Sequence, residues 1–150
     1  MKRMILVLLV LCLLPAWVFA AENVTFLHYF SGTLAGGIDD LVKTFNAENP
    51  QYNLTHTPAD HEAFKTSIQV MLSGGNPPDL FSYWAGARVQ FIVDAGRLEP
   101  IDDVFEKNGL NKLFSDGVLQ GCTYNGKKYF MPLTVHYAAF FYNKAVFANL

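Results

Sequence analysis

The spacing of apolar residues after residue 20 alternates between the two-residue period of a strand and the longer period of a helix. The segment Asn23–Tyr29 alternates and precedes a glycine-rich stretch, so we expect a strand and then a loop over Ser31–Gly37. The next pattern predicts a helix over Ile38–Asn49 that stops before a proline. Asp39 and Asp40 then fall in its first turn, where carboxylates favour the helix dipole.

The alternation of strand and helix continues as far as residue 95. We expect a strand over Tyr52–Thr57, a helix capped by Asp60 and closed at Gly74-Gly75, a strand over Leu80–Tyr83 and a helix over Arg88–Ala95. This β-α-β-α-β-α order predicts the α/β fold class, with a mainly parallel sheet flanked by helices.

The pattern changes after Pro100. Two short helical turns are expected within Asp102–Phe114, and a hairpin within Cys122–Met131 turns at an Asn-Gly pair suited to type I′ geometry. An apolar strand is expected over Val135–Tyr142, and a helix begins at Lys144. Because nothing that follows would cover the apolar side of that helix, we expect an incomplete domain.

The first twenty residues have the pattern of a secretory signal peptide. Lys2 and Arg3 precede an apolar run that Pro15 interrupts, and small residues allow cleavage after Ala20. A membrane anchor is the alternative, but the run is shorter than the roughly 20 apolar residues that span a bilayer. Cys12 follows a bulky leucine, which disfavours lipidation.

Composition narrows the function further. The chain has 11 basic and 13 acidic residues, and the signal segment removes Lys2 and Arg3, which leaves a net charge of −4. A mildly acidic surface without a basic cluster beyond Lys127-Lys128 argues against nucleic acid as a partner. The processed chain keeps only Cys122, so no intrachain disulfide is expected.

No catalytic motif is evident. Gly32 and Gly37 have the spacing of a phosphate-binding loop, but Ile38-Asp39 replace its Lys-Ser/Thr, and no Gly-x-Ser-x-Gly elbow occurs. We therefore expect no enzyme and no cofactor. One alternative remains, a metal ion held by histidines near neighbouring strand ends together with an acidic residue. The residues of this site would be His28, His56 and His61 with Asp60 or Glu62. No HxxxH or CxxC spacing supports it.

Four short motifs occur in a recognisable order: Pro78-Asp79 before a strand, Ala95-Gly96 with Leu98 and Pro100 after a helix, Tyr-Asn-Gly-Lys at Tyr124–Lys127, and Tyr142-Asn143-Lys144. Together they resemble the extracellular solute-binding proteins of carbohydrate ABC transporters, the family 1 type that includes maltose-binding protein. The resemblance covers essentially the whole chain after the signal. Members of that family are usually well over twice this long.

The resemblance implies two α/β lobes that close on a sugar between them. Residues 1–20 would be the signal peptide, 21–132 part of a periplasmic-binding-protein type II-like first lobe, and 133–150 the hinge strand and the start of the second lobe. The expected function is capture of a sugar or oligosaccharide outside the cytoplasm by a monomer and its delivery to the permease subunits. The expected location is the periplasm, or alternatively the cell surface. A truncated, non-functional product is the other alternative.

The ligand crevice of an open parallel sheet lies at the carboxyl ends of its strands. The loops expected there are Tyr29–Gly37, Thr57–Glu62 and Tyr83–Arg88. Rings stack on the C–H faces of sugars, and polar groups satisfy hydroxyls, because a buried polar group without a partner costs about 1–3 kcal/mol. Together with the resemblance, these loops give seven candidate ligand-binding residues: Trp84, Phe30, Ser31, His136, His61, Glu62 and Tyr137.

Most of these candidates also have a structural explanation. Trp84 matches a pocket tryptophan of the family, or packs under the following helix. Phe30 and Ser31 stand where the best-known relatives carry charged side chains, which favours stacking and one hydroxyl contact over charge-assisted bonds. His136 stands where maltose-binding relatives carry a sugar-binding glutamate, or is a core histidine of an apolar strand. Glu62 is also explained as an acid in the first turn of a helix.

Overall fold

A computed structural model describes residues 20–136 and 139–148 of the 150-residue chain. The chain divides into two compact units, the first ending at Ser82 and the second beginning at Tyr83. The expected signal peptide lies almost entirely outside the described residues. Within the described part, we find no helix with the length and apolar character needed to cross a membrane.

The first unit is built on a three-stranded parallel sheet in the order β2-β1-β3. Strands β1 (Glu22–His28) and β2 (Tyr52–Pro58) pair along their whole length, and β1 also pairs with the short β3 (Leu80–Phe81). The register runs from Glu22 beside Tyr52 to His28 beside Pro58, so both strands end at the same edge of the sheet. The predicted α/β class with a parallel sheet is confirmed.

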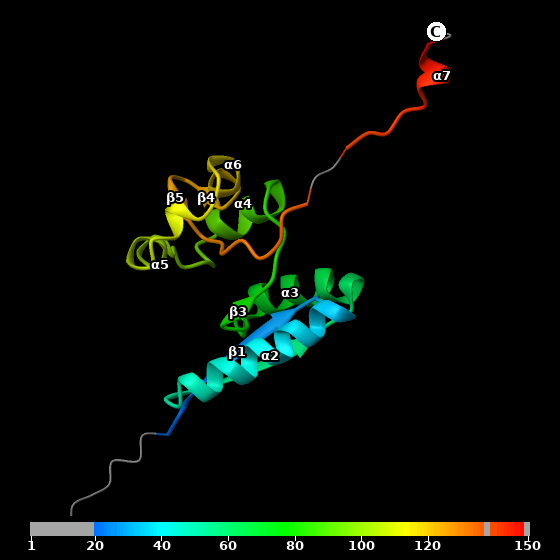
Figure 1. Cartoon of the computed structure of the whole chain (residues 1–150). Coiled ribbons are helices and arrows are strands. Elements are labelled where there is room, and N and C mark those ends of the chain that lie inside the picture. Colours follow the sequence, from blue (N-terminus) through cyan, green and yellow to red (C-terminus); the bar gives the residue numbers. More distant parts are fainter. Residues whose placement is uncertain (1–19, 137–138, 149–150) are drawn as a thin grey trace, which may run out of the picture. The chain divides into compact units, whose positions relative to one another are not determined.

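Two helices cover opposite faces of this sheet (Figure 1). Asp39 of α2 (Thr33–Glu48) reaches His56 of β2, whereas Phe64 of α3 (His61–Gly74) contacts the ring of Tyr29 next to the end of β1. Successive strand residues face opposite sides, which places α2 over the His28 face and α3 over the Tyr29 face. The core of the unit consists of Leu27, Phe30, Val42, Leu54, Phe64, Ile68 and Leu72.

Helix α2 begins at Thr33, earlier than the sequence pattern predicted, and it includes Gly36 and Gly37. Asp39 and Asp40 are therefore not in its first turn. Each helical glycine costs about 1 kcal/mol relative to alanine, but tertiary contacts commonly outweigh such propensities. Here the amide of Asn46 donates to the Leu54 carbonyl at 2.9 Å and accepts the Leu54 N–H at 2.8 Å, which fixes α2 to β2.

Helix α3 has both predicted end signals. One carboxylate oxygen of Asp60 accepts the backbone N–H groups of Glu62 and Ala63, at 2.9 and 3.2 Å. At the other end, Gly75 takes a φ of 81°, the left-handed conformation that glycine adopts without a steric penalty. The N-cap at Asp60 and the glycine stop are confirmed.

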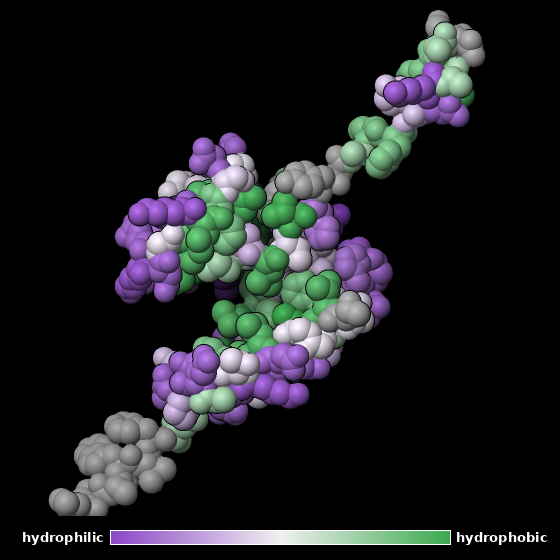
Figure 2. Space-filling view, viewed as in Figure 1, coloured by the Kyte–Doolittle hydropathy of each residue, from purple (hydrophilic) through white to green (hydrophobic). Residues whose placement is uncertain are grey.

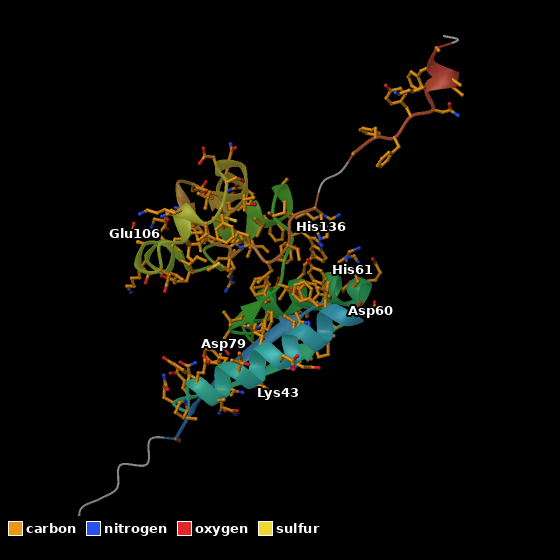
Figure 3. All side chains as sticks on the ribbon, viewed as in Figure 1. Lys43, Asp60, His61, Asp79, Glu106 and His136 are labelled. Carbon is orange, nitrogen blue, oxygen red and sulfur yellow. The ribbon has the colours of Figure 1, made fainter. Side chains whose placement is uncertain are left out.

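The Pro78-Asp79 motif ties β3 to β1. The Asp79 carboxylate accepts both the N–H and the hydroxyl of Thr25, at 2.8 and 2.7 Å, and the Asp79 N–H donates back to the Thr25 hydroxyl at 3.0 Å. These hydrogen bonds lower the pKa of the Asp79 carboxyl group. Figure 3 shows Asp79 toward one end of this unit and Asp60 and His61 at the other, as a parallel sheet requires.

The second unit consists of short helices and one hairpin: α4 (Ala87–Asp94), α5 (Asp102–Lys107), a 3-10 turn (Leu110–Lys112), α6 (Asp116–Gly121), β4 (Thr123–Tyr124), β5 (Lys127–Lys128) and α7 (Lys144–Phe147). The hairpin turns at Asn125 and Gly126, whose φ values of 51° and 78° are those of the predicted type I′ turn. The core of the second unit contains Val89, Ile92, Val93, Phe105, Cys122 and Tyr124.

Side-chain hydrogen bonds hold this hairpin to its helices. The Tyr124 hydroxyl accepts the Gly86 N–H at 2.6 Å, and the Asn125 amide donates to Asp94 at 3.0 Å. The free thiol of Cys122 is buried immediately before the hairpin, and burial raises its pKa.

The strand expected over Val135–Tyr142 does not form among the described residues 133–136 and 139–143. A strand needs a neighbour to hydrogen-bond its backbone, and the described part of the chain supplies none for this segment. Phe140 and Phe141 are 103% and 98% exposed, and Figure 2 shows this stretch as hydrophobic surface. The expected helix after it is the single short α7.

Candidate functional site

The loops that follow β1 and β2 leave the sheet side by side. His28 and Pro58 are register partners at the ends of the two strands, and the Ala59 N–H donates to the His28 carbonyl at 2.8 Å. The residues after them, the turn Tyr29–Gly32 and the segment Asp60–Glu62, therefore project from one edge. This is the edge at which open parallel sheets bind ligands.

Tyr29 occupies the centre of this edge. Its ring contacts those of Phe30, His61 and Phe64 at centroid distances of 5.2, 5.5 and 5.2 Å. Its N–H donates to the hydroxyl of Ser82 at 3.2 Å, which connects it to the residue after β3. Burial raises the pKa of Tyr29, so its phenol is protonated at neutral pH. The sequence placed Tyr29 in a ligand loop but did not select it; its position at the end of an alternating strand was the available signal.

His61 and Glu62 form a polar group at the start of α3. Figure 3 shows His61 at this end of the unit. The Nδ1 atom of His61 lies 2.9 Å from a Glu62 carboxylate oxygen, and the Lys65 ammonium donates to that same oxygen at 2.6 Å. The hydrogen bond from Lys65 and then that from His61 lower the pKa of Glu62, so the carboxylate is charged at neutral pH. Both predicted residues are exposed at the strand edge.

Phe30 and Ser31 differ in accessibility. Phe30 retains only 9% exposure, because its ring stacks on His28 at 5.6 Å and contacts Tyr29. Ser31 is exposed and precedes Gly32, whose φ of 60° begins the approach to α2. Phe30 therefore contributes to packing in this structure, whereas the Ser31 side chain is accessible.

The remaining predicted residues belong to the second unit. Trp84 is half-buried and meets the Tyr83 ring edge-on at 5.4 Å, so it is not wholly covered by the following helix. His136 is exposed in a segment without helix or strand. Tyr137 lies outside the described residues. The structure thus groups Ser31, His61 and Glu62 at the strand ends of the first unit.

The three histidines of the metal alternative do not converge. His28 Nε2 lies 3.0 Å from His56 Nδ1, and His56 Nε2 lies 3.0 Å from Asp39, whereas His61 contacts Tyr29 on the other face of the sheet. Across residues 20–136 and 139–148, no three His, Cys, Asp or Glu side chains are arranged to hold a metal ion. The metal-carrier alternative therefore has no site in the described residues.

A surface hollow of about 540 Å³ lies in the C-terminal segment. Its walls are almost entirely apolar, and none of the seven predicted ligand-binding residues lines it. The residues that line the hollow are Phe140, Phe141, Tyr142, Asn143, Val146 and Phe147. A hydroxyl-rich ligand would leave most of its polar groups unsatisfied there.

Solved structures of similar fold include receptors of sugars. A bacterial solute receptor, AcbH, described as having a substrate preference for β-D-galactopyranose, is 29% identical with a TM-score of 0.66 over 75% of this chain and 28% of its own. A chitin oligosaccharide binding protein is 25% identical with a TM-score of 0.66, over 75% of this chain and 28% of its own. These matches share the α/β fold of the present chain.

Curated relatives point to the same class of protein. An uncharacterized ABC transporter extracellular-binding protein of Pyrococcus horikoshii is 28% identical, over 84% of this chain and 30% of its own length. The sn-glycerol-3-phosphate-binding periplasmic protein UgpB of Shigella flexneri is 30% identical, over 61% of this chain and 21% of its own length. The chain thus spans less than a third of these relatives.

The family model described as "Bacterial extracellular solute-binding protein" matches residues 31–150, which is most of the chain. The matched region contains all four motifs on which the sequence resemblance was based. The resemblance predicted from the sequence is therefore confirmed, and this chain belongs to the family of bacterial extracellular solute-binding proteins.

Proposed function

We propose that this chain provides one wall of the sugar site of an ABC-transporter solute-binding protein. The observation that carries the proposal is the shared edge at which β1 and β2 end. Two loops leave that edge joined by the Ala59–His28 hydrogen bond, and they bring together a phenol, a hydroxyl, an imidazole and a carboxylate. Rings and hydrogen-bonding groups are the two features that sugar recognition requires.

A neutral sugar suits this edge better than a phosphorylated ligand, although one relative is a glycerol-3-phosphate-binding protein. Asp60 and Glu62 are two residues apart at the start of α3, and the Lys65 ammonium donates to the Glu62 carboxylate at 2.6 Å. An incoming phosphate would meet this carboxylate charge, and like charges at contact distance repel. A hydroxyl would instead donate to Glu62 in a charge-assisted hydrogen bond.

We assign roles to the predicted residues on this basis. Ser31, His61 and Glu62 hydrogen-bond the sugar hydroxyls. Trp84 belongs to the second unit, and its role as a stacking face is proposed from the family resemblance. Phe30 acts mainly by supporting Tyr29, which it contacts at 5.2 Å. His136 and Tyr137 follow from the resemblance alone, and they remain proposals for the opposite side of the ligand.

The proposed protein works as a monomeric receptor in the periplasm after signal cleavage, or alternatively at the cell surface. Ligand contacts stabilise a closed state over an open one, and the permease recognises the closed state and accepts the sugar. No step in this cycle makes or breaks a covalent bond, so the proposal involves no catalysis.

The test is calorimetric titration of the protein encoded by the complete reading frame with galactose, chitotriose, maltotriose, xylotriose and sn-glycerol-3-phosphate. We expect heat with at least one neutral sugar and none with the phosphate. At 100 times Kd, a ligand stabilises the folded state by about 2.7 kcal/mol, which a thermal shift detects. Absence of heat and of thermal shift with every sugar would overturn the proposal, and binding of the phosphate alone would overturn the choice of ligand class.

A matched pair of variants tests the site. Trp84→Ala removes the proposed stacking face, whereas Phe91→Ala removes a 53% exposed ring of the same unit that has no proposed ligand role. Loss of an aromatic stacking partner costs about 1–3 kcal/mol for a nucleic-acid base, and on that scale we expect the first variant to weaken sugar affinity by roughly tenfold. Equal affinities of the two variants would remove Trp84 from the site.

A further inference from the structure

Three side chains form a continuous hydrogen-bonded row between the sheet and α2. The Asp39 carboxylate lies 3.0 Å from His56 Nε2, and His56 Nδ1 lies 3.0 Å from His28 Nε2. The rings of His28 and His56 are nearly parallel, at an interplanar angle of 12°. At the inner end of the row, His28 is completely buried and its Nδ1 has no hydrogen-bond partner.

This geometry dictates the tautomers at neutral pH. A carboxylate only accepts, so His56 carries its proton on Nε2 and donates to Asp39. The Nδ1 atom of His56 is then an acceptor, and His28 must donate to it from Nε2. The unpartnered Nδ1 of His28 is consequently a bare lone pair in the interior.

One additional proton does not fit this row. If His56 becomes an imidazolium, its Nδ1–H faces the Nε2–H of His28, and two donors oppose each other at 3.0 Å. If His28 instead moves its proton to Nδ1, a buried N–H is left without an acceptor. Either arrangement loses a hydrogen bond or strands a buried polar group, and both are unfavourable.

The charged groups around His28 agree with this conclusion. Burial and the neighbouring His56 lower the pKa of His28, and only Asp39 opposes them. Asp39 comes from α2 and His56 from β2, while the paired segment of β3, Leu80–Phe81, has no titratable side chain. Because one hydrogen bond joins the two rings, an added proton on either ring disrupts the same contact.

The inner end of the row supports the turn at the strand edge. His28 is the last residue of β1, and its carbonyl accepts the Ala59 N–H. Its ring is the surface on which Phe30 stacks at 5.6 Å, and the Tyr29 N–H beside it donates to Ser82. A change in the orientation of His28 therefore acts on both loops of this edge.

We propose that the Asp39–His56–His28 row is a proton-sensitive clamp on the turn Tyr29–Gly32: it holds the turn at neutral pH, and uptake of one proton by the histidine pair releases it. This inference goes beyond sugar binding, and it stands whether or not the protein binds a sugar. If the proposed function also holds, mild acid outside the cytoplasm weakens ligand retention.

The test is amide hydrogen exchange of the full chain by NMR at pH 7.5 and 5.5, without ligand. Protection factors correct for the intrinsic pH dependence of exchange. We expect protection of the Tyr29 and Ala59 amides to fall by about tenfold between the two pH values. The Thr25 amide, bonded to Asp79 at the other end of the sheet, should change less than about twofold if the loosening is local. Unchanged protection of Tyr29 and Ala59 would overturn the clamp.

Two variants make the test specific. Asp39→Asn keeps an acceptor for His56 but removes the charge that raises the pKa of His28, so release of the turn should require a lower pH. Asp40→Asn is the matched control, because Asp40 is the exposed neighbour on the same helix and takes no part in the row. The midpoint is the pH at which half of the protection of the Tyr29 and Ala59 amides is lost. Equal shifts of this midpoint in both variants would show that the Asp39–His56–His28 row does not control release of the turn. Nitrogen-15 shifts of the two histidines at pH 7.5 must also report Nε2–H tautomers for both rings.

Discussion

Different kinds of contact stabilise the interior of each of the two units of this chain. In the first, seven consecutive register pairs join β1 to β2, and apolar helix faces cover both sides of the sheet. In the second, the strands are two residues long, and side chains such as Tyr124 and Asn125 bridge the hairpin to the helices. Backbone pairing tolerates side-chain changes, so we expect polar substitutions to damage the second unit more than the first.

The largest effect is expected from removing a buried ring in either unit. Phe64 and Phe105 are both 0% exposed, and truncation to alanine should lower the free energy of unfolding by about 3–5 kcal/mol in each case. Urea denaturation measures the change, and Phe64→Leu and Phe105→Leu are milder controls. A cost below about 1 kcal/mol in one unit would show that its core collapses around the loss, and the two cores would then differ in packing.

A smaller effect, confined to the second unit, is expected from Tyr124→Phe. The change removes the hydroxyl that accepts the Gly86 N–H at 2.6 Å, and because Gly86 is exposed, we expect the loss of one ordinary hydrogen bond, about 0.5–1.5 kcal/mol. Tyr142→Phe is the control, because Tyr142 is 61% exposed. If both variants denature at the wild-type urea concentration, the polar bridge does not stabilise the hairpin.

Mild acid should destabilise the first unit. The pKa of His28 is lower in the folded than in the unfolded chain, so the unfolded chain binds more protons once the pH falls below about 6.5. The contribution of His28 to stability is therefore constant above that pH and declines below it, with a slope of at most about 1.4 kcal/mol per pH unit. Urea midpoints between pH 8 and 5 measure this decline, and His28→Phe should remove it. A rise in stability on acidification would mean that the Asp39 ion pair outweighs burial.

The smallest of these effects is expected at the start of α3. Asp60→Ala removes the oxygen that accepts two backbone N–H groups, which costs about 1 kcal/mol. Asp60→Ser restores an acceptor and should recover most of the loss. Helices α2 and α4 begin after Gly32 and Gly86 without a side-chain cap, so alanine at those positions tests backbone strain instead.

Local signals predicted elements in both units. The alternation of β1 and the Asp60 cap in the first unit, and the Asn125-Gly126 turn in the second, depend only on neighbouring residues, and each is found where expected. The start of α2 was wrong because glycine propensity was weighed without the Asn46 contacts to Leu54, which are tertiary. The strand expected over Val135–Tyr142 is absent from the described residues of that segment, because a strand forms only beside a partner strand.

The candidate site was predicted in its residue types but not in its connections. Loops at the strand ends were identified, and His61 and Glu62 do lie there. The hydrogen bond between His28 and His56 was not predicted, because it depends on the register of two strands whose histidines are 28 residues apart in sequence. Alternation along one strand shows which side a residue faces, but it does not show what lies across from it.

The burial of Cys122 has a practical consequence. A thiolate is the reactive form of cysteine, and this thiol has a raised pKa and only 5% exposure beside the hairpin that Tyr124 anchors. A thiol-specific reagent therefore modifies Cys122 when its surroundings open, and the labelling rate reports how often that happens. The chain thus contains an intrinsic kinetic probe of this region that requires no engineered label.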